Sequence, residues 1–309
     1  MQIHRSFDKL DNIKNPVVTT GTFDGVHFGH KVIINRLNLL AKNINGQSVL
    51  ITFNPHPRSV LYPNDIGKNL KLINSQEEKI YLLQKAGLDH LIIINFTLNF
   101  AKTTSEQFVK DILLQKLKAK IIIVGFNHHF GHNREGDYSY LYKLTKTNNF
   151  IVEEIPEQDL ENETVSSTIT RKALLDGRIQ RANAYLDHFF IVIGQLIKGK
   201  QKCQELGFPT LEIVIDESTK LIPRQGVYAI SIKYKDTRYR GMLNIKTYDT
   251  KNPSVQVHLF DYNTSTSLEN QNVIVSFHKR MRNELQLNNS DSLKTQLIKD
   301  KEEIKALIY

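Results

Sequence analysis

The sequence predicts an α/β protein in which a doubly wound domain is followed by a small antiparallel β-barrel and a C-terminal helix. In the first half of the chain, short aliphatic runs alternate with helical patterns, as they do in parallel sheets covered by helices. From Phe189 onward, six short strand-like runs follow one another without helices between them, which is typical of a small barrel. We therefore expect two domains, residues 1–186 and residues 187–309.

Four strands and three helices are predicted in the first 124 residues of the first domain. The strands are short aliphatic and β-branched runs, namely Val17–Thr20, Val49–Phe53, Leu91–Asn95 and Ile121–Val124. The helices carry apolar residues at helical spacing and span Lys31–Lys42, Ser75–Ala86 and Ser105–Lys118. The second helix is expected to start at a capping box, because Ser75 and Glu78 have the required spacing.

The second domain is expected to contain six strands and one helix. The strands are Phe189–Ile193, Leu211–Ile215, Val227–Tyr234, Gly241–Ile245, Val255–Phe260 and Val273–Phe277. The helix spans Ser290–Leu307 and carries leucine and isoleucine on one face.

Length and composition allow two globular domains and exclude several other classes of protein. Hydrophobic residues make up 40% and charged residues 24% of the 309 residues, as is usual for globular proteins. The longest apolar runs are too short to cross a membrane, and the start of the chain lacks the pattern of a signal peptide. Cys203 is the one cysteine, so an internal disulfide is excluded and a reducing cytoplasm is expected. The net charge is +9, but Lys and Arg are scattered, so we expect neither a nucleic-acid nor a membrane partner.

The stretch from Gly21 to His30, between the first strand and the first helix, has the pattern of a nucleotide-binding turn. Its glycines allow a sharp turn, and the following helix N-terminus offers N–H groups to a phosphate. His27 and His30 are three residues apart, so they share a face of the first helical turn and can neutralise charge on a phosphate. The alternative is an ordinary strand–helix corner with two surface histidines.

The pattern His27-x-Gly29-His30 resembles the H-x-G-H signature of nucleotidylyltransferases. The longer match from Gly21 to His30 resembles one branch of them, the bacterial bifunctional riboflavin kinase/FMN adenylyltransferases, also called FAD synthetases. This resemblance implies a Rossmann-like first domain in which His27 and His30 are catalytic and contact the ATP phosphates. It implies further ATP contacts from Gly21, Phe23, Asp24 and Gly29.

A second motif, Asn54–Pro57, follows the strand Val49–Phe53. Its two prolines stop a helix, so we expect an extended loop at the carboxyl end of the strand, the edge that carries ligands in parallel sheets. The alternative is a rigid turn without a ligand. The motif resembles the family's Thr-Phe-x-Pro-His-Pro loop, which implies that Asn54, Pro55, His56 and Pro57 lie on the FMN side of the site.

A third motif, Gly125–Asp137, follows the strand Ile121–Val124. It resembles a family loop that implies FMN contacts from Asn127 and Arg134, although Asn127 replaces the usual aspartate and His128-His129 replaces Phe-Arg. Asparagine keeps the hydrogen-bonding capacity and loses the charge. The histidines of this loop allow a metal site as an alternative, but no carboxylate or cysteine lies at a zinc-like spacing from them.

A fourth motif, Val165–Arg171, precedes a predicted helix. Hydroxyl groups at such a place often serve only as a helix cap. The segment also resembles the family's S-S-T-x-x-R motif, which implies that Ser166, Ser167 and Thr168 bind the ATP phosphates. In that interpretation Arg171 is catalytic and grips phosphate through its guanidinium group.

The second domain resembles the riboflavin kinase barrel of the same family. The resemblance implies a kinase-like site at Gly199, Thr210, Glu212, Gln256 and Arg282, in which Thr210 holds Mg²⁺.

Several positions of this barrel depart from the family pattern. Cys203-Gln204 stand where the phosphate loop has Gly-Arg, Glu212 replaces an asparagine, and Lys246 replaces a glycine. Gln256 replaces the glutamate that takes the proton from the 5′-hydroxyl of riboflavin. An amide cannot act as a base at neutral pH, so the kinase activity is expected to be weak or absent.

We therefore expect an FMN adenylyltransferase that uses ATP, FMN and Mg²⁺ and carries a kinase-like barrel. Small-molecule substrates also account for the positive charge of the chain. Three alternatives remain: a fully bifunctional enzyme that also accepts riboflavin, a nucleotidylyltransferase for another phosphate substrate, and a non-catalytic flavin-binding protein. The motif Asn54–Pro57 argues against the second, and intact His27, Gly29, His30 and Arg171 argue against an inert chain.

Overall fold

A computed structural model describes residues 1–8, 10, 12–126, 128–156, 159–160, 163–199, 208, 210–246, 253–260, 262, 268–285 and 290–308. These residues fall into two compact units. Unit 1 comprises Met1–Lys71 and Lys79–Val165, and unit 2 comprises Leu72–Glu78 and Ser166–Tyr309. The boundary expected between residues 186 and 187 stays a prediction.

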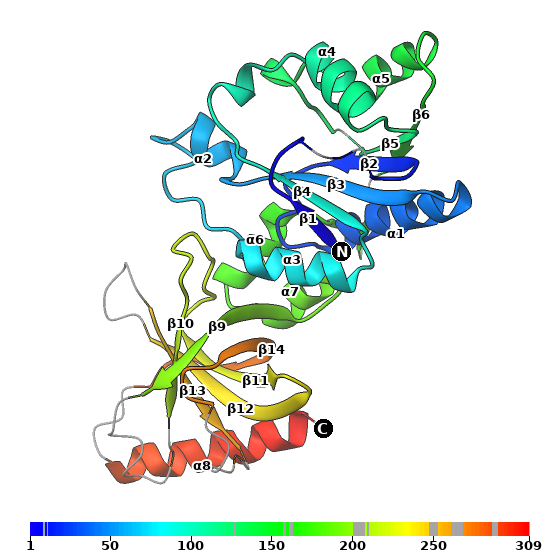
Figure 1. Ribbon diagram of the computed structural model, residues 1–309. Coiled ribbons are helices and arrows are strands. Elements are labelled where there is room, and N and C mark those ends of the chain that lie inside the picture. Colours follow the sequence, from blue (N-terminus) through cyan, green and yellow to red (C-terminus); the bar gives the residue numbers. More distant parts are fainter. Residues whose placement is uncertain are drawn as a thin grey trace. The chain divides into compact units, whose positions relative to one another are not determined.

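Unit 1 is built on a six-stranded sheet with the order β1-β4-β3-β2-β5-β6, and every neighbouring pair is parallel (Figure 1). The strands are β1 (Gln2–His4), β2 (Pro16–Thr20), β3 (Gln47–Phe53), β4 (His90–Ile94), β5 (Ile121–Gly125) and β6 (Ile151–Ile155). The four predicted strands are confirmed as β2 to β5. A short two-stranded hairpin is formed by β7 (Asp159–Leu160) and β8 (Glu163–Thr164).

Helices cover both faces of this sheet, as expected for a doubly wound fold. On one face α1 (Phe28–Asn43) packs against β2, β3 and β5. On the other face Phe108, Val109 and Leu113 join an apolar core with residues of the four central strands. The remaining helical segments are α2 (Pro57–Leu61), α3 (Gln76–Lys85), η1 (Phe100–Lys102), α4 (Ser105–Gln107), η2 (Phe108–Lys116), η3 (His132–Arg134) and α5 (Tyr138–Thr145).

The strand order reverses direction at β2. From β2 the chain continues outward through β3 and β4 on one side, and it then crosses to β5 and β6 on the other side. In open parallel sheets, ligands bind outside the carboxyl ends of the strands at this reversal point. The turn from Gly21 to His27 follows β2, and the loop from Phe126 follows β5, so both expected binding segments lie at this edge.

Unit 2 contains a closed antiparallel barrel with the order β10-β13-β12-β11-β14-β9. The strands are β9 (Phe190–Lys198), β10 (Leu211–Val214), β11 (Gly226–Tyr234), β12 (Thr237–Lys246), β13 (Ser254–Leu259) and β14 (Asn272–Arg282). The helices of the unit are α6 (Ser167–Leu175), α7 (Ile179–Leu186) and α8 (Ser290–Leu307). The six predicted strands, the barrel and the C-terminal helix are therefore confirmed.

Two sequence-based expectations about local structure were wrong. The prolines of the second motif do not exclude a helix, because Pro57 is the first residue of α2, where a proline lacks no needed hydrogen bond. The fourth motif does not precede a helix, because α6 starts at Ser167 and contains Arg171.

The helix predicted over Ser105–Lys118 divides into α4 and a π-helical segment, Phe108–Lys116. Apolar side chains at Phe108, Ile112 and Leu113 suit either helix type, so their spacing in the sequence does not distinguish the two. The capping box predicted for α3 is confirmed: Glu78 N donates to Ser75 Oγ at 3.2 Å, and Ser75 N donates to Glu78 Oε2 at 3.0 Å.

A buried ion pair between Lys220 and Glu78 lies inside unit 2, and both side chains are fully buried. Lys220 Nζ donates to Glu78 Oε2 at 2.5 Å and to the carbonyl oxygens of Ile73 and Ile191 at 2.6 and 2.9 Å. The other carboxylate oxygen of Glu78 accepts from Ile193 N at 3.0 Å. The hydrogen bonds of both charged groups are thus met inside the protein, which is the condition for burying them.

No helix in the described part of the chain is long and apolar enough to span a bilayer.

We expect Lys220→Met to lower the free energy of unfolding of unit 2 by about 3–5 kcal/mol, because it leaves the Glu78 carboxylate buried without its cation. Arg178→Met is the matched control, since it removes one partner of an ion pair, Arg178–Asp176, whose side chains are 64% and 39% exposed. Urea unfolding of both variants measures the difference. Equal unfolding free energies for the two variants would contradict the importance of the buried pair.

Candidate functional site

The turn between β2 and α1 has an unusual backbone conformation. Phe23, Gly25 and Val26 have φ angles of 48°, 91° and 43°. Glycine adopts such angles readily, whereas phenylalanine and valine do so rarely. The side chains of Phe23 and Val26 are 2% and 0% exposed, so their burial stabilises a turn that is unfavourable by itself.

The two histidines of the turn lie against each other at the N-terminus of α1. His27 is the N-cap residue and His30 lies in the first turn of the helix. Their ring centroids are 3.6 Å apart, and the ring of Phe23 stacks on His30 at 4.4 Å. The prediction that both histidines share one face is confirmed.

Burial lowers the pKa of His30 well below its usual value of 6.5, and the positive charges of His27 and Lys79 lower it further. His30 is therefore neutral at pH 7 in the free protein. Its Nδ1 atom is buried and has no hydrogen-bond partner among the described residues. A buried ring nitrogen without a partner at a helix N-terminus is suited to receive a ligand atom.

A residue without any sequence signal, Lys79 of α3, completes this turn. Lys79 is 5% exposed and donates from Nζ to the carbonyl oxygen of Thr22 at 2.8 Å. The hydroxyl of Thr52 donates to the same oxygen at 3.3 Å. Lys79 lies in a helix far along the chain, so only the folded structure brings it to the turn.

The other residues expected in the site of unit 1 follow the carboxyl ends of β2 and β3. Gly21 follows β2 directly, Asp24 is 2% exposed, and Gly29 lies in the first turn of α1. In the loop after β3, Asn54 and Pro55 are exposed. His56 and Pro57 begin α2, and His56 Nδ1 accepts from Arg58 N at 3.1 Å, so this histidine also serves as a helix cap.

The loop after β5 contains the half-buried His128 and the exposed Arg134. Burial lowers the pKa of His128 to about 4, and the positive charges of His129 and Arg134 contribute. Arg134 is exposed and ends the short helix η3. Asn127 lies outside the described residues. The described residues contain no cluster of three or more side chains that could hold a metal ion.

The hydroxyl-rich motif lies in unit 2. Ser166 is the N-cap of α6 and accepts from Ile169 N at 3.4 Å, while Ser167, Thr168 and Arg171 lie in the first two turns of that helix. The capping role of Ser166 is thus real. The contact of these residues with the same ligand as His27 and His30 stays a prediction.

A second candidate site is the pocket of the barrel in unit 2. Strand register brings four polar residues of the barrel into one row: Glu212 lies opposite Gln256, Gln256 opposite Asn244, Asn244 opposite Val227, and Val227 opposite Arg282. Gln256, Asn244 and Arg282 line the pocket, whereas Glu212 does not. The carboxylate of Glu212 instead accepts from Ser254 Oγ at 2.7 Å.

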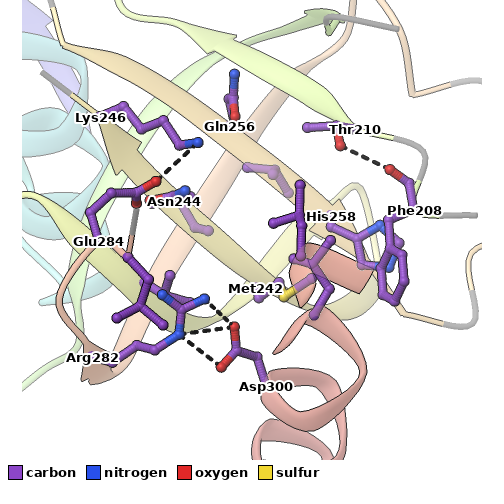
Figure 2. Close-up of a pocket in the computed structure, with 16 residues that line it drawn as sticks. Phe208, Thr210, Met242, Asn244, Lys246, Gln256, His258, Arg282, Glu284 and Asp300 are labelled. Atoms are coloured by element: carbon purple, nitrogen blue, oxygen red, sulfur yellow. Dashed lines mark hydrogen bonds and ion pairs between the residues drawn. The ribbon is translucent and has the colours of Figure 1, made fainter. Parts of the chain in front are cut away.

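Two ion pairs line the barrel pocket (Figure 2). Arg282 Nε donates to both carboxylate oxygens of Asp300 in α8, at 3.0 and 3.1 Å. Lys246 Nζ lies 3.0 Å from Glu284 Oε1. Figure 2 shows the Lys246–Glu284 pair across the pocket from Thr210 and Phe208. Both pocket-lining carboxylates are therefore engaged with a cation.

Gly199 and Thr210 have structural roles in the barrel. A Cβ atom at Gly199 would lie 2.5 Å from the carbonyl oxygen of Thr210, so only glycine permits the close approach of β9 to the start of β10. The hydroxyl of Thr210 donates to the carbonyl oxygen of Phe208 at 2.9 Å. Cys203 and Gln204 lie outside the described residues.

Sequence comparisons divide the chain into two known parts. A family described as FAD synthetase matches residues 9–169, and a family described as riboflavin kinase matches residues 186–308. Two bacterial proteins named bifunctional riboflavin kinase/FMN adenylyltransferase match along nearly the whole chain. The protein from Buchnera aphidicola subsp. Schizaphis graminum is 33% identical over 99% of this chain and 98% of its own length. The protein from Haemophilus influenzae is 31% identical over 99% of both chains.

A solved structure has the same overall fold. It is described as a macrolide-efflux protein from Streptococcus pneumoniae, and it matches with a TM-score of 0.87 and 26% identity over 98% of each chain.

We expect a phosphate ligand at the His27–His30 turn to raise the pKa of His30, because a nearby anion favours the protonated ring. Because the pKa of the free ring is low, a raised pKa in the complex makes binding stronger as the pH falls toward the pKa of the free ring. Nuclear magnetic resonance of the His30 ring with and without inorganic pyrophosphate measures this shift. A pKa that stays unchanged at saturating pyrophosphate would exclude His30 from the anion site.

Proposed function

The chain belongs to the family of bifunctional riboflavin kinase/FMN adenylyltransferases, and we propose that it transfers AMP from ATP to FMN, giving FAD and pyrophosphate. The observation that carries this proposal is the stacked pair of His27 and His30 at the first turn of α1, beside the reversal point of a parallel sheet. The match of residues 9–169 to the FAD synthetase family supports it.

The reaction needs an anion site rather than a protein nucleophile. An oxygen of the FMN phosphate attacks the α-phosphorus of ATP, the bond to the β-phosphate breaks, and pyrophosphate leaves. Transfers of this kind depend on positioning and on stabilising the charge of the leaving group. His27 and His30 are proposed to contact the ATP phosphates. Since His30 is neutral before binding, its ring can take up a proton as negative charge gathers at the turn.

The remaining motif residues are assigned to the two substrates. ATP contacts are proposed for Gly21, Phe23, Asp24, Gly29, Ser166, Ser167 and Thr168, and Arg171 is proposed to hold the leaving pyrophosphate. The FMN side is proposed to comprise Asn54, Pro55, His56, Pro57, Asn127 and Arg134. Those FMN residues that the structure describes lie after the carboxyl ends of β3 and β5, where ligands bind in parallel sheets, and this position supports their assignment.

Mg²⁺ is proposed to enter with ATP, as part of the substrate, and to offset phosphate charge. The site expected at Thr210 is not a complete metal site by itself. Thr210 offers one hydroxyl, and the nearby carboxylate of Glu212 is hydrogen-bonded to Ser254. Magnesium commonly keeps several waters and takes the rest of its ligands from substrate phosphates, so a sparse protein contribution is compatible with such binding.

We further propose that the barrel has little or no riboflavin kinase activity. Gln256 occupies the position of the base and carries an amide, which does not accept a proton at neutral pH. The pocket-lining carboxylates of Glu284 and Asp300 each hold a cation, so neither can accept a proton without breaking an ion pair. The match of residues 186–308 to the riboflavin kinase family supports the fold of the barrel and leaves this activity to experiment.

The bifunctional alternative is favoured by one observation. Glu212 lies directly opposite Gln256 in the strand register, so its carboxylate is the nearest substitute for the missing base along the row. Its absence from the pocket lining and its bond to Ser254 argue against that role.

The purified protein is expected to convert FMN and Mg-ATP to FAD, as measured by chromatography. His27→Ala and His30→Ala are each expected to slow this reaction by roughly 10²-fold or more, as for the loss of one charge-stabilising group. His188→Ala, outside both proposed sites, is the control. No FAD from folded wild-type protein would refute the activity, and near wild-type turnover in either variant would remove that histidine from the site.

Riboflavin and Mg-ATP without FMN are expected to give no FMN and no FAD, because loss of a general base alone typically lowers the rate by about 10²–10⁴-fold. Gln256→Glu alone is not expected to restore the reaction, since Cys203-Gln204 would still stand in place of the phosphate-binding Gly-Arg pair. Robust FMN formation by the wild type would overturn the proposal. Its loss in Glu212→Ala would then identify Glu212 as the substitute base.

A further inference from the structure

The anion site at the His27–His30 turn needs a source of positive charge that His30 does not supply. Burial and neighbouring positive charges keep this ring neutral in the free protein. The N-terminus of α1 contributes a partial positive charge, but ATP brings several negative charges at once. A group that is charged before the ligand arrives would attract the phosphates and reduce the reorganisation needed at the turn.

Lys79 lies where such a charge is needed. Its ammonium group donates to the carbonyl oxygen of Thr22, the residue before the turn's first positive φ angle, at 2.8 Å. It is close enough to His30 for its charge to disfavour a proton on that ring. The lysine is 5% exposed, which is rare for this residue type without a structural or functional reason.

The carbonyl oxygen of Thr22 has to be held and neutralised if a phosphate is to bind nearby. A carbonyl carries partial negative charge, so an unpaired one beside the ligand would repel it. Thr52 supplies a neutral hydrogen bond of 3.3 Å to this oxygen, whereas Lys79 supplies a shorter and charged one. The two donors also fix the chain where the strained segment Phe23–Val26 begins.

We propose that Lys79 is a positioning residue of the nucleotide site, which anchors the phosphate-binding turn through the Thr22 carbonyl and adds a fixed positive charge for the ATP phosphates. The identity of the ligand rests on the proposed function. The anchoring and the charge rest on the contacts of Lys79 with the turn.

Substitutions can separate the two contributions. Lys79→Gln keeps a hydrogen-bond donor for the Thr22 carbonyl and removes the charge. Lys79→Met removes both, Lys79→Arg keeps the charge, and Thr52→Val removes only the neutral hydrogen bond. Lys85→Met is the matched control, because Lys85 lies on the same helix and is exposed.

The test is the affinity of the full-length protein for the Mg²⁺ complex of α,β-methylene-ATP, measured by calorimetry at several salt concentrations. Lys79→Gln and Lys79→Met are expected to weaken binding roughly 10- to 100-fold and to reduce its salt dependence, as for loss of a charged hydrogen-bonding partner. Lys79→Arg is expected to retain most of the affinity, Thr52→Val to retain the salt dependence, and Lys85→Met to match the wild type. In FAD formation, the KM for ATP is expected to rise while the KM for FMN stays constant.

A second readout reports the charge directly. Removing the positive charge in Lys79→Gln is expected to raise the pKa of His30, measured by nuclear magnetic resonance, and an unchanged pKa would show that the charge of Lys79 does not reach the turn. If Lys79→Met does not fold, Lys79→Gln decides the matter.

Wild-type affinity and salt dependence in folded Lys79→Gln, or an effect on kcat alone, would overturn the proposal. The outcome is distinguishable from a failure of the proposed function. If the wild type makes no FAD but binds the analogue more tightly than Lys79→Gln does, the role of Lys79 is supported and FMN is excluded as the substrate. If the wild type makes FAD and Lys79→Gln has the same activity and affinity, the role of Lys79 is refuted and the proposed function is not.

Discussion

The candidate site of unit 1 depends on one constraint: the chain leaving β2 has to turn through three residues with positive φ before α1 begins. Two of them, Phe23 and Val26, are not glycine, and such conformations cost about 1–3 kcal/mol each. Complete burial of a phenylalanine or valine side chain contributes about 1.5–3 kcal/mol, so the core into which these side chains pack can offset the strain. The same turn stacks Phe23, His30 and His27 and places a buried ring nitrogen without a partner at a helix N-terminus.

In the barrel of unit 2, different residues shape the fold and line the proposed reaction site. At Gly199 the missing side chain lets the end of β9 approach the start of β10, and Arg282 joins β14 to α8 through Asp300. These two contacts belong to the framework of unit 2. At the positions that our proposal assigns to proton transfer and phosphate binding, the barrel carries an amide at Gln256 and a cation at Lys246. A barrel can retain its fold while losing such groups, because the polar side chains of Gln256 and Asn244 are not part of the apolar core, whereas Val227 is.

Much of the fold follows from the sequence because its elements have regular apolar patterns. The central strands of the sheet, the six barrel strands and α8 were predicted from such patterns. The edge strand β1 was not, because Gln2 and Ile3 are exposed and give the segment no apolar pattern. The strand β6 was missed for a similar reason, since it includes Glu153 and Glu154. Histidines in a glycine-containing turn identified the candidate site in the sequence. Lys79 could not be identified in this way, because a lysine in a helix is usually solvated. The contact of Lys79 with Thr22 exists only in the folded chain.

The most direct test of the account is a single reaction that contains isotopically labelled riboflavin, unlabelled FMN and Mg-ATP, with the flavins separated and analysed by mass. We expect FAD that carries no label and labelled riboflavin that remains unchanged, because AMP transfer to FMN proceeds while phosphorylation of riboflavin does not. Labelled FMN or labelled FAD would contradict the inactive barrel, and a reaction without any FAD would contradict the adenylyltransferase itself.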